Sequence, residues 1–240
     1  MHIGNRRLAA ASAIAAVAAL AVAPQPASAS SHQPCTVVKH GNTKGVTKIG
    51  GATATVGADG IKLTTTTTSD ADKVSWQDSI KPVPANTITE LSYETIKLDS
   101  AGPNVNDAAL PAYHVYVKTP QGAGTLVYEP YWSPGVNNPP RNLRIEWDVL
   151  KGKLWTPSEN VIAGLPKTAG GPATKTFAQV VAENPKMTVT GIGFGLGTYN
   201  RGVEAVLDEQ RIATKKSCSD HQWSTGFQNG PWWPSWLRRS

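Results

Sequence analysis

The sequence predicts an all-β fold, an antiparallel sandwich of strands with one short helix near residues 176–184. From Thr36 to Ala213, short runs of Val, Ile, Thr, Tyr and Trp are separated by clusters of Gly, Pro, Asn and Asp, which is the pattern of strands joined by turns. A pair of cysteines, Cys35 and Cys218, brackets this stretch. A single segment inside it has helical spacing.

The strand segments are rich in β-branched and aromatic residues. The first, Ile61–Thr64, runs into the threonines Thr64–Thr68, whose branched side chains favour extended backbone. The Gly-Ala-Gly sequence at 122–124 is expected to be the hairpin turn between two later strands. Those later strands are expected at Leu91–Leu98, Ala112–Lys118, Thr125–Trp132, Leu143–Val149, Thr188–Leu196 and Val203–Ile212.

Glycines alternate with bulky apolar residues from Gly191 to Gly197. One face of that strand therefore packs through side chains such as Phe194, while the other face has almost none. We expect a neighbouring group or a ligand to approach the backbone closely there. The turn that follows is expected at Tyr199–Gly202.

The segment with helical spacing is Thr176–Glu183. Its apolar residues Phe177, Val180 and Val181 follow the three-and-four spacing of a short helix, which Asn184-Pro185 ends. A single helix among strands is expected to cap one end of the sandwich. The Gly- and Pro-rich stretch before it is expected to be an exposed loop.

The chain begins with the features of a cleavable signal peptide. A basic start at Arg6-Arg7 precedes the apolar run Leu8–Ala23 and the small residues Ala27–Ala29. We expect residues 1–29 to be removed and the protein to be secreted to the extracellular space. The apolar run is short for a membrane span, which takes about 20 residues, and no later segment approaches that length. The paired arginines leave the general and the twin-arginine export routes open.

In the oxidising compartment that this leader implies, Cys35 and Cys218 are expected to form a disulfide. The bond would join the ends of one domain, residues 30–218, whose length suits a single sandwich. Residues 219–240 form a Trp-rich basic tail, which could contact a membrane surface or fold back onto the sandwich, and no role is assigned to it. The tail contains Trp223, Trp232, Trp233 and Trp236.

Charge and motif content exclude several classes of function. The net charge of +6 is scattered along the chain, so that no basic cluster predicts nucleic-acid binding. The chain lacks the His-Glu-x-x-His, Gly-x-Ser-x-Gly and phosphate-loop motifs. No cofactor is expected apart from a structural metal ion considered below. We expect a monomer without a transmembrane segment.

Three stretches resemble secreted bacterial jelly-roll domains related in style to carbohydrate-binding modules and to concanavalin-like or galactose-binding-like sandwiches. Trp147–Trp155 resembles their tryptophan-rich strand and turn, Phe177–Pro185 their short helix, and Gly191–Ile212 their terminal hairpin with one Asp in its last strand. The resemblance implies a jelly-roll arrangement of strands and a tendency to bind sugars. It implies no particular substrate, because a fold does not by itself assign a function.

Aromatic residues are concentrated in the middle of the chain, and flat rings with polar edges suit the apolar faces of sugars as well as they suit cores. Strand alternation separates Tyr116, on a more polar face, from Tyr113, on an apolar face. Trp147 lies between apolar neighbours and is expected in the core. The remaining candidates for a sugar-binding platform are Tyr116, Tyr131, Trp132 and Trp155.

Paired carboxyl groups are the strongest enzymatic possibility, since a glycoside hydrolase needs two of them roughly 5 to 10 Å apart. Glu94 and Glu129 could serve as acid and base if the strand faces that carry them line one groove. The alternative is that both are solvated on outer faces. Glu146 and Asp148 are expected to be such outer-face residues.

Asp208, in the closing strand, is expected either to be a hydrogen-bonded structural residue or, as the resemblance implies, to help bind a structural calcium ion. Asp70 and Asp72 could supply further oxygen ligands. His114 is expected to be a surface or hydrogen-bonded histidine.

We therefore expect a secreted, non-catalytic module that binds an extracellular or cell-wall carbohydrate, a polysaccharide or glycan, through an aromatic face of a sheet. Two alternatives stay open. One is a polysaccharide-degrading enzyme that uses Glu94 and Glu129, and the other is a structural or protein-interaction module of the cell surface.

Overall fold

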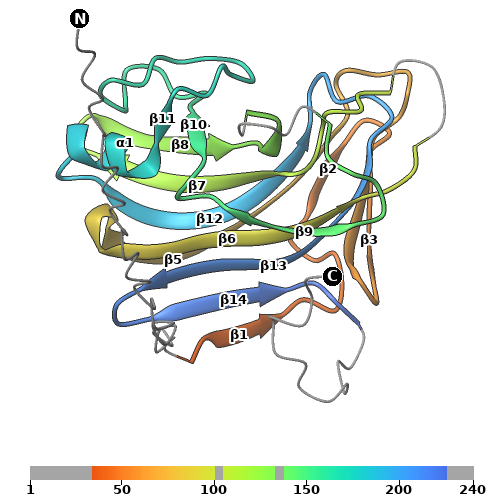
Figure 1. Cartoon of the computed structure of the whole chain (residues 1–240), viewed down its shortest axis with the longest axis horizontal. Helices are drawn as coiled ribbons and strands as arrows, with labels where there is room; N and C mark the ends of the chain where they lie inside the picture. The colour runs from red at the N-terminus through yellow and green to blue at the C-terminus, as the bar shows by residue number, and fades with distance from the viewer. Residues whose placement is uncertain (1–33, 101–104, 133–137, 226–240) are drawn as a thin grey trace, which may run out of the picture. The chain divides into compact units, whose positions relative to one another are not determined.

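The computed structural model describes residues 34–100, 105–132 and 138–225. These residues form two seven-stranded sheets and one α-helix, which confirms the all-β prediction (Figure 1). The predicted signal peptide and most of the predicted tail lie outside the described residues. Within those residues, no helix has the length and apolar character needed to cross a bilayer. The jelly-roll wiring of the strands stays a prediction.

Sheet 1 consists of β1 (Thr36–Lys39), β3 (Thr53–Gly57), β4 (Gly60–Thr64), β6 (Ile88–Lys97), β9 (Arg144–Asp148), β13 (Glu204–Thr214) and β14 (Cys218–Gln222). One edge of β13 pairs with β6, and β9 follows β6. The other edge of β13 is shared, because β4 pairs with residues 204–207 and β14 with residues 210–213. β3 lies outside β4, and β1 runs parallel to β14.

Sheet 2 consists of β2 (Thr47–Ile49), β5 (Lys73–Pro84), β7 (Ala112–Thr119), β8 (Gly122–Tyr128), β10 (Lys153–Trp155), β11 (Lys175–Thr176) and β12 (Thr188–Gly197). The strand order is β11-β10-β8-β7-β12-β5-β2. Figure 1 shows β8, β7 and β12 side by side, and β5 pairs with the other edge of β12. The glycine-alternating strand β12 is thus interior, with β5 and β7 antiparallel on its two edges.

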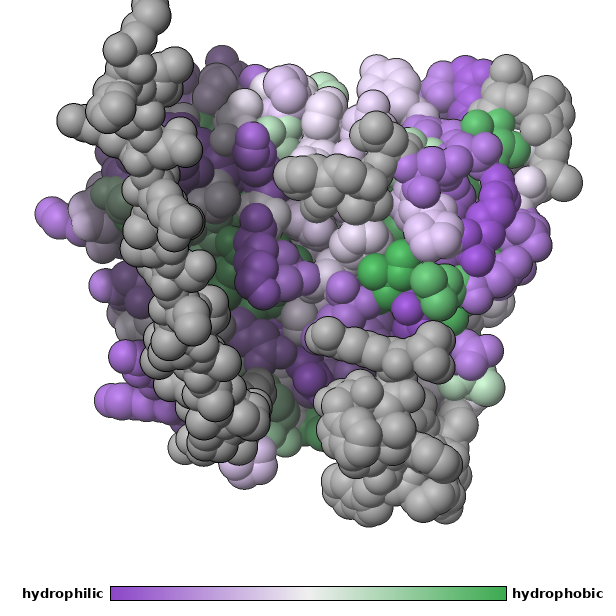
Figure 2. Space-filling model, in the orientation of Figure 1, coloured by the Kyte–Doolittle hydropathy of each residue, from purple (hydrophilic) through white to green (hydrophobic). Residues whose placement is uncertain are grey.

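The core lies between the two sheets and contains aromatic rings from both. Tyr93 of sheet 1 contacts Tyr113 of sheet 2, with ring centroids 5.5 Å apart. Their hydroxyls donate to the backbone carbonyls of Pro111 and Arg211, at 2.8 and 2.7 Å. Burial of each large apolar side chain contributes about 1.5–3 kcal/mol. The largest fully buried side chains are Trp223, Tyr93, Tyr113, Phe194, Ile61, Leu63, Leu91, Leu126, Leu154, Met187, Ile192 and Leu196. On the surface, the face in Figure 2 is mostly hydrophilic and shows hydrophobic residues in small separate patches.

The two ends of the described chain meet at the edge of sheet 1. Cys35 and Cys218 form the expected disulfide, with their Cα atoms 4.4 Å apart. The fold continues past Cys218, because β14 runs to Gln222 and Trp223 is fully buried. The ring of Trp223 stacks on His40 with centroids 4.0 Å apart. Strand β14 thus extends past the predicted domain end at Cys218, and the other three tail tryptophans lie outside the described residues.

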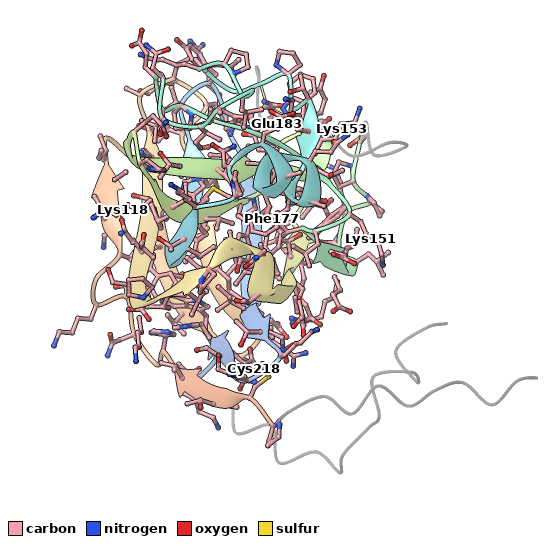
Figure 3. The ribbon with its side chains drawn as sticks, turned by 90° about the vertical axis from the view of Figure 1, so that its left-hand side faces the viewer. Lys118, Lys151, Lys153, Phe177, Glu183 and Cys218 are labelled. Carbon is pink, nitrogen blue, oxygen red and sulfur yellow. A yellow bond between two sulfur atoms is a disulfide. The ribbon has the colours of Figure 1, made fainter. Side chains whose placement is uncertain are left out.

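The predicted helix is present as α1 (Phe177–Glu183). The Thr176 hydroxyl accepts from the Gln179 backbone amide, and the Gln179 side chain accepts from the Thr176 amide, so that the first turn is closed by a capping box. Phe177 and Val180 are buried. Figure 3 shows Glu183 near the top of the view, Phe177 near its middle and Cys218 near the bottom.

Two local predictions are wrong. The threonine run leaves the strand after Thr64, because Thr66 binds the Asp72 carboxylate through both its backbone amide and its hydroxyl. The hairpin between β7 and β8 turns at Pro120-Gln121, where Thr119 pairs with Gly122. The glycines at 122–124 therefore begin a strand.

Two further segments differ from the predicted pattern. Trp132 does not extend a strand but lies in the 3-10 turn η2 (Pro130–Trp132), and a second such turn, η1, spans Ala85–Thr87. The sequence also does not predict β5, although it is 12 residues long. Polar residues such as Asp78 interrupt its apolar alternation beyond Trp76.

Candidate functional site

The candidate site lies on the face of sheet 2 that points away from the core. Along β7, Tyr113 and Val115 are buried in the core, so that His114 and Tyr116 project from the opposite face. They line a cavity of about 460 Å³, a size common among ligand-binding pockets. Its walls come from β5, β7, β8, β10 and β12 and from residues 167–170 and 198–200. We call it the first cavity.

The glycines of β12 allow the rings of β7 to lie close to the sheet. A Cβ atom on Gly195 would lie 2.6 Å from Cε1 of His114, and one on Gly193 would lie 3.1 Å from Cε2 of Tyr116. The added Cβ at Gly193 would also collide with the backbone carbonyl of Trp76. The expected close approach to the backbone is therefore observed, and the neighbouring groups are His114 and Tyr116.

Glu129 joins two of the predicted platform residues. Its Oε2 atom accepts hydrogen bonds from the indole N–H groups of Trp132 and Trp155, at 3.0 and 3.2 Å. Burial raises the pKa of Glu129, and the two indole hydrogen bonds oppose that shift. The carboxylate thus fixes the orientation of both rings. Trp132 also donates to the Gly170 carbonyl at 3.1 Å, which ties the loop at 167–170 to the site.

A second cavity of about 320 Å³ adjoins the first. Tyr131 and Trp132 line it, and Tyr131 is 42% exposed. The two cavities share Glu129 and residues 169–170 and 198–200 in their walls. All four predicted platform residues therefore surround one site, with Tyr116 and Trp155 in the first cavity and Tyr131 and Trp132 in the second.

Tyr199 is a further aromatic residue at this site that the sequence reasoning placed only in a turn. It lines both cavities and is 68% exposed. Its backbone φ is +71°, and that of Thr198 is +45°. Backbone hydrogen bonds from Thr198 to Asp72 and from Tyr199 to Asp70, both 3.1 Å long, hold this conformation. Non-glycine residues in this region of backbone space are uncommon and are often found at functional sites.

The charged and titratable groups of the first cavity include His114, Lys73 and Lys167. Burial, together with the nearby positive charge of Lys73, lowers the pKa of His114 to about 4. The imidazole is therefore neutral at pH 7, and its ring contacts Tyr116 edge-on with centroids 6.2 Å apart. Lys167 pairs with Glu159 at 3.3 Å.

Glu94 is not part of this site. Its strand neighbours Tyr93 and Thr95 are buried in the core, so Glu94 lies on the outer face of sheet 1, where Arg144 binds it at 2.9 Å. Glu129 lies on the outer face of sheet 2. The condition for the hydrolase prediction, that Glu94 and Glu129 line one groove, is therefore not met.

Asp208 also lies on sheet 1 and uses its carboxylate for protein contacts. One oxygen accepts from Arg144 at 3.2 Å and the other from the Trp223 backbone amide at 3.2 Å. The two suggested co-ligands are separate from it, since Asp70 pairs with Arg201 and Asp72 binds Thr66. The described part of the chain contains no group of three His, Cys, Asp or Glu residues that could hold a metal ion.

No protein-family model and no curated protein matches this chain. The interpretation of the site therefore depends on its own geometry.

Proposed function

We propose that the protein is a secreted, non-catalytic module that binds a polysaccharide or glycan in the groove formed by the two adjoining cavities. In this proposal it acts as a monomer, since one chain builds the whole groove, and its strands follow the jelly-roll arrangement of the carbohydrate-binding modules that it resembles. The ligand is extracellular or part of a cell wall.

The observation that carries the proposal is the gathering of aromatic rings around Glu129. Tyr116, Trp155 and Trp132 come from three separate parts of the chain, and two of them are oriented by the same carboxylate. Orienting hydrogen bonds reduce the rotamer entropy that a ring loses when it stacks on a ligand. Rings with one apolar face and polar edges, held in an open groove, suit a sugar.

The same geometry favours binding over hydrolysis. The Oε2 atom of Glu129 already accepts two indole hydrogen bonds, and Glu94, its predicted partner, is on the other sheet. A pair of carboxyl groups that flank one bond is therefore not formed by these residues.

Affinity electrophoresis through gels that contain soluble polysaccharides tests the proposal. We expect at least one polymer to retard the wild-type protein, and the variants Trp155→Ala and Tyr116→Ala to bind about tenfold less tightly or worse, because each loses a stacking surface. Leu143→Ala is the matched control, since Leu143 is 54% exposed and lies outside both cavities.

Two results would contradict the proposal. If a broad panel of polysaccharides leaves the mobility unchanged, the structural or protein-interaction alternative replaces it. If a polymer is bound and Leu143→Ala weakens that binding as much as Trp155→Ala, the groove is not the binding surface.

A further inference from the structure

Positively charged groups outnumber negatively charged ones in the wall of the first cavity. Lys73 and Lys167 contribute two ammonium groups, whereas Glu129 contributes one carboxylate. That carboxylate already accepts hydrogen bonds from two indoles, and neither lysine is its partner. The cavity therefore has more positive charge than its own side chains neutralise.

Lys73 is the clearest case of an unused charge. It begins β5 opposite Gly197, in the wall of the cavity. Within the described residues its ammonium group makes no hydrogen bond and no ion pair, yet it is close enough to His114 for its charge to act on the imidazole. A cation beside a pocket, without an internal partner, is free to bind an anionic ligand group.

The neighbouring loop offers further groups to a ligand. Lys167 and its partner Glu159 are 56% and 67% exposed, and such exposed pairs contribute little, so that Lys167 can exchange this partner for a ligand anion. The next residue, Thr168, also lines the cavity, and its buried hydroxyl has no hydrogen-bond partner among the described residues. An unpaired buried hydroxyl is unfavourable unless a bound group satisfies it.

The second cavity has a different character. Among the described residues, no lysine or arginine lines it, and its lining includes Tyr131, Trp132, Asn106 and Asn200. It therefore suits a neutral part of a ligand that stacks on rings and bonds to amides. The two halves of the groove thus differ in charge.

We propose that the ligand is an anionic polysaccharide, with carboxylate or sulfate groups, whose charged group binds Lys73 in the first cavity while a neighbouring sugar unit stacks in the second. This inference rests on the proposed carbohydrate-binding function and specifies the class of ligand. The two sources of negative charge, uronate and sulfate ester, share the chemistry that Lys73 recognises and are distinguished in the experiment.

The test uses two pairs of polymers that differ only in charge: polygalacturonate with its methyl ester, and dextran sulfate with dextran. We expect the full-length protein to bind at least one charged polymer about tenfold more tightly than its uncharged partner, and the difference to shrink as salt is added. We expect Lys73→Met, which keeps the aliphatic stem, to lose most of that difference.

Lys118→Met is the matched control. Lys118, labelled in Figure 3, is an exposed lysine on β7 that lies outside both cavities. If it weakens binding as much as Lys73→Met, the attraction comes from overall charge and the inference fails. If the uncharged polymers bind equally well and Trp155→Ala abolishes that binding, the anionic ligand is wrong but the carbohydrate-binding proposal stands. If none of the four polymers binds, the anionic inference fails, and the broader panel decides the proposed function.

Discussion

The outer faces of the two sheets both contain polar side chains but use them in different ways. On sheet 1, Arg144 binds both Glu94 and Asp208, at 2.9 and 3.2 Å. A second arginine, Arg211, binds Asp220 at 3.3 Å and Glu209 at 3.4 Å. These charged groups pair with one another, although Arg211 Nε and Asp220 Oδ1 are buried without a hydrogen-bond partner among the described residues. On sheet 2, the polar groups of the outer face line an open groove, and Lys73 has no partner among the described residues.

This difference teaches that strand alternation identifies outer faces but not binding faces. Glu94 and Tyr116 both lie between residues that point into the core, so strand alternation predicts an outer-face position for each of them. The distinction depends on the strand that lies beside each of them. On sheet 1 the neighbouring strand β9 supplies the countercharge Arg144 to Glu94, whereas on sheet 2 the neighbouring strand β12 places glycine beside Tyr116. The predictions below test this contrast, from the largest expected effect to the smallest.

The largest effect is expected from Gly193→Ala, on β12 beside Tyr116. The added methyl group would collide with the backbone carbonyl of Trp76, which cannot rotate away, and we expect the free energy of unfolding to fall by about 3 kcal/mol. Urea denaturation measures this change. Gly41→Ala is the control, because no atom of the described residues lies within 4 Å of a Cβ atom at Gly41. Equal stability of the two variants would show that β12 is not packed as closely as described.

Removal of one cation from each outer face should lower stability for sheet 1 but leave stability nearly unchanged for sheet 2. Arg144→Met deprives two largely buried carboxylates of their partner, and Glu94 and Asp208 are only 12% and 6% exposed. We expect it to lower the free energy of unfolding by about 2 kcal/mol, less than for a fully buried pair because Arg144 is itself 26% exposed. Lys73→Met should change it by less than about 0.5 kcal/mol, since no internal partner is lost.

The comparison fails if Lys73→Met destabilises the protein as much as Arg144→Met in the same urea titration. That result would mean that Lys73 has a structural role, as the sheet 1 charges do.

The two faces should also differ in their response to pH. Burial and the nearby Glu94 carboxylate raise the pKa of Glu209, on sheet 1, from 4.5 to about 7. Between these values the folded state binds more protons, so the stability that Glu209 contributes is lost as the pH rises through about 7. The pKa of His114, on sheet 2, falls from 6.5 to about 4 in the folded state. Its contribution is therefore lost as the pH falls from 6.5 toward 4.

Unfolding free energies measured from pH 4 to pH 8 test both statements. We expect Glu209→Gln to remove a contribution that lowers stability as the pH rises from about 4.5 to 7, and His114→Gln to remove one that lowers stability as the pH falls from about 6.5 to 4. If either variant leaves the corresponding part of the pH profile as steep as in the wild-type protein, that group does not have the environment described.

Local sequence patterns predict the helix and strands of this fold better than they predict which strands pair with one another. The periodicity of Phe177 and Val180 identifies α1, and the Asn184-Pro185 pair identifies its end, because both signals lie within a few residues. The prediction that the threonine run continues the strand is wrong. Asp72, six residues from Thr66, accepts hydrogen bonds from Thr66 that compete with strand pairing. Strand β5 is not predicted, because some of its polar residues face solvent and others face neighbouring strands. The sequence of one strand does not show which strands will lie beside it.

The site was predictable in its residue types and only partly in its geometry. Aromatic content and alternation select Tyr116, Tyr131, Trp132 and Trp155, all of which line the groove. The pairing of Glu94 with Glu129 fails because alternation gives the side of a strand but not the sheet to which the strand belongs. Lys73 and Tyr199 were missed because nothing near them in the sequence indicates that β12 brings them beside β7.

The smallest stability effect is expected from Tyr199→Gly, which tests whether the strained turn is kept for the groove. Glycine adopts the observed φ of +71° without the cost of about 1 kcal/mol that a side chain incurs there, but it loses more backbone entropy on folding. We expect these terms to offset each other within about 0.5 kcal/mol in urea denaturation. Polysaccharide binding should weaken about fivefold, because the ring shared by both cavities is gone. A variant that binds as well as the wild-type protein would remove Tyr199 from the site and leave its strain without a function.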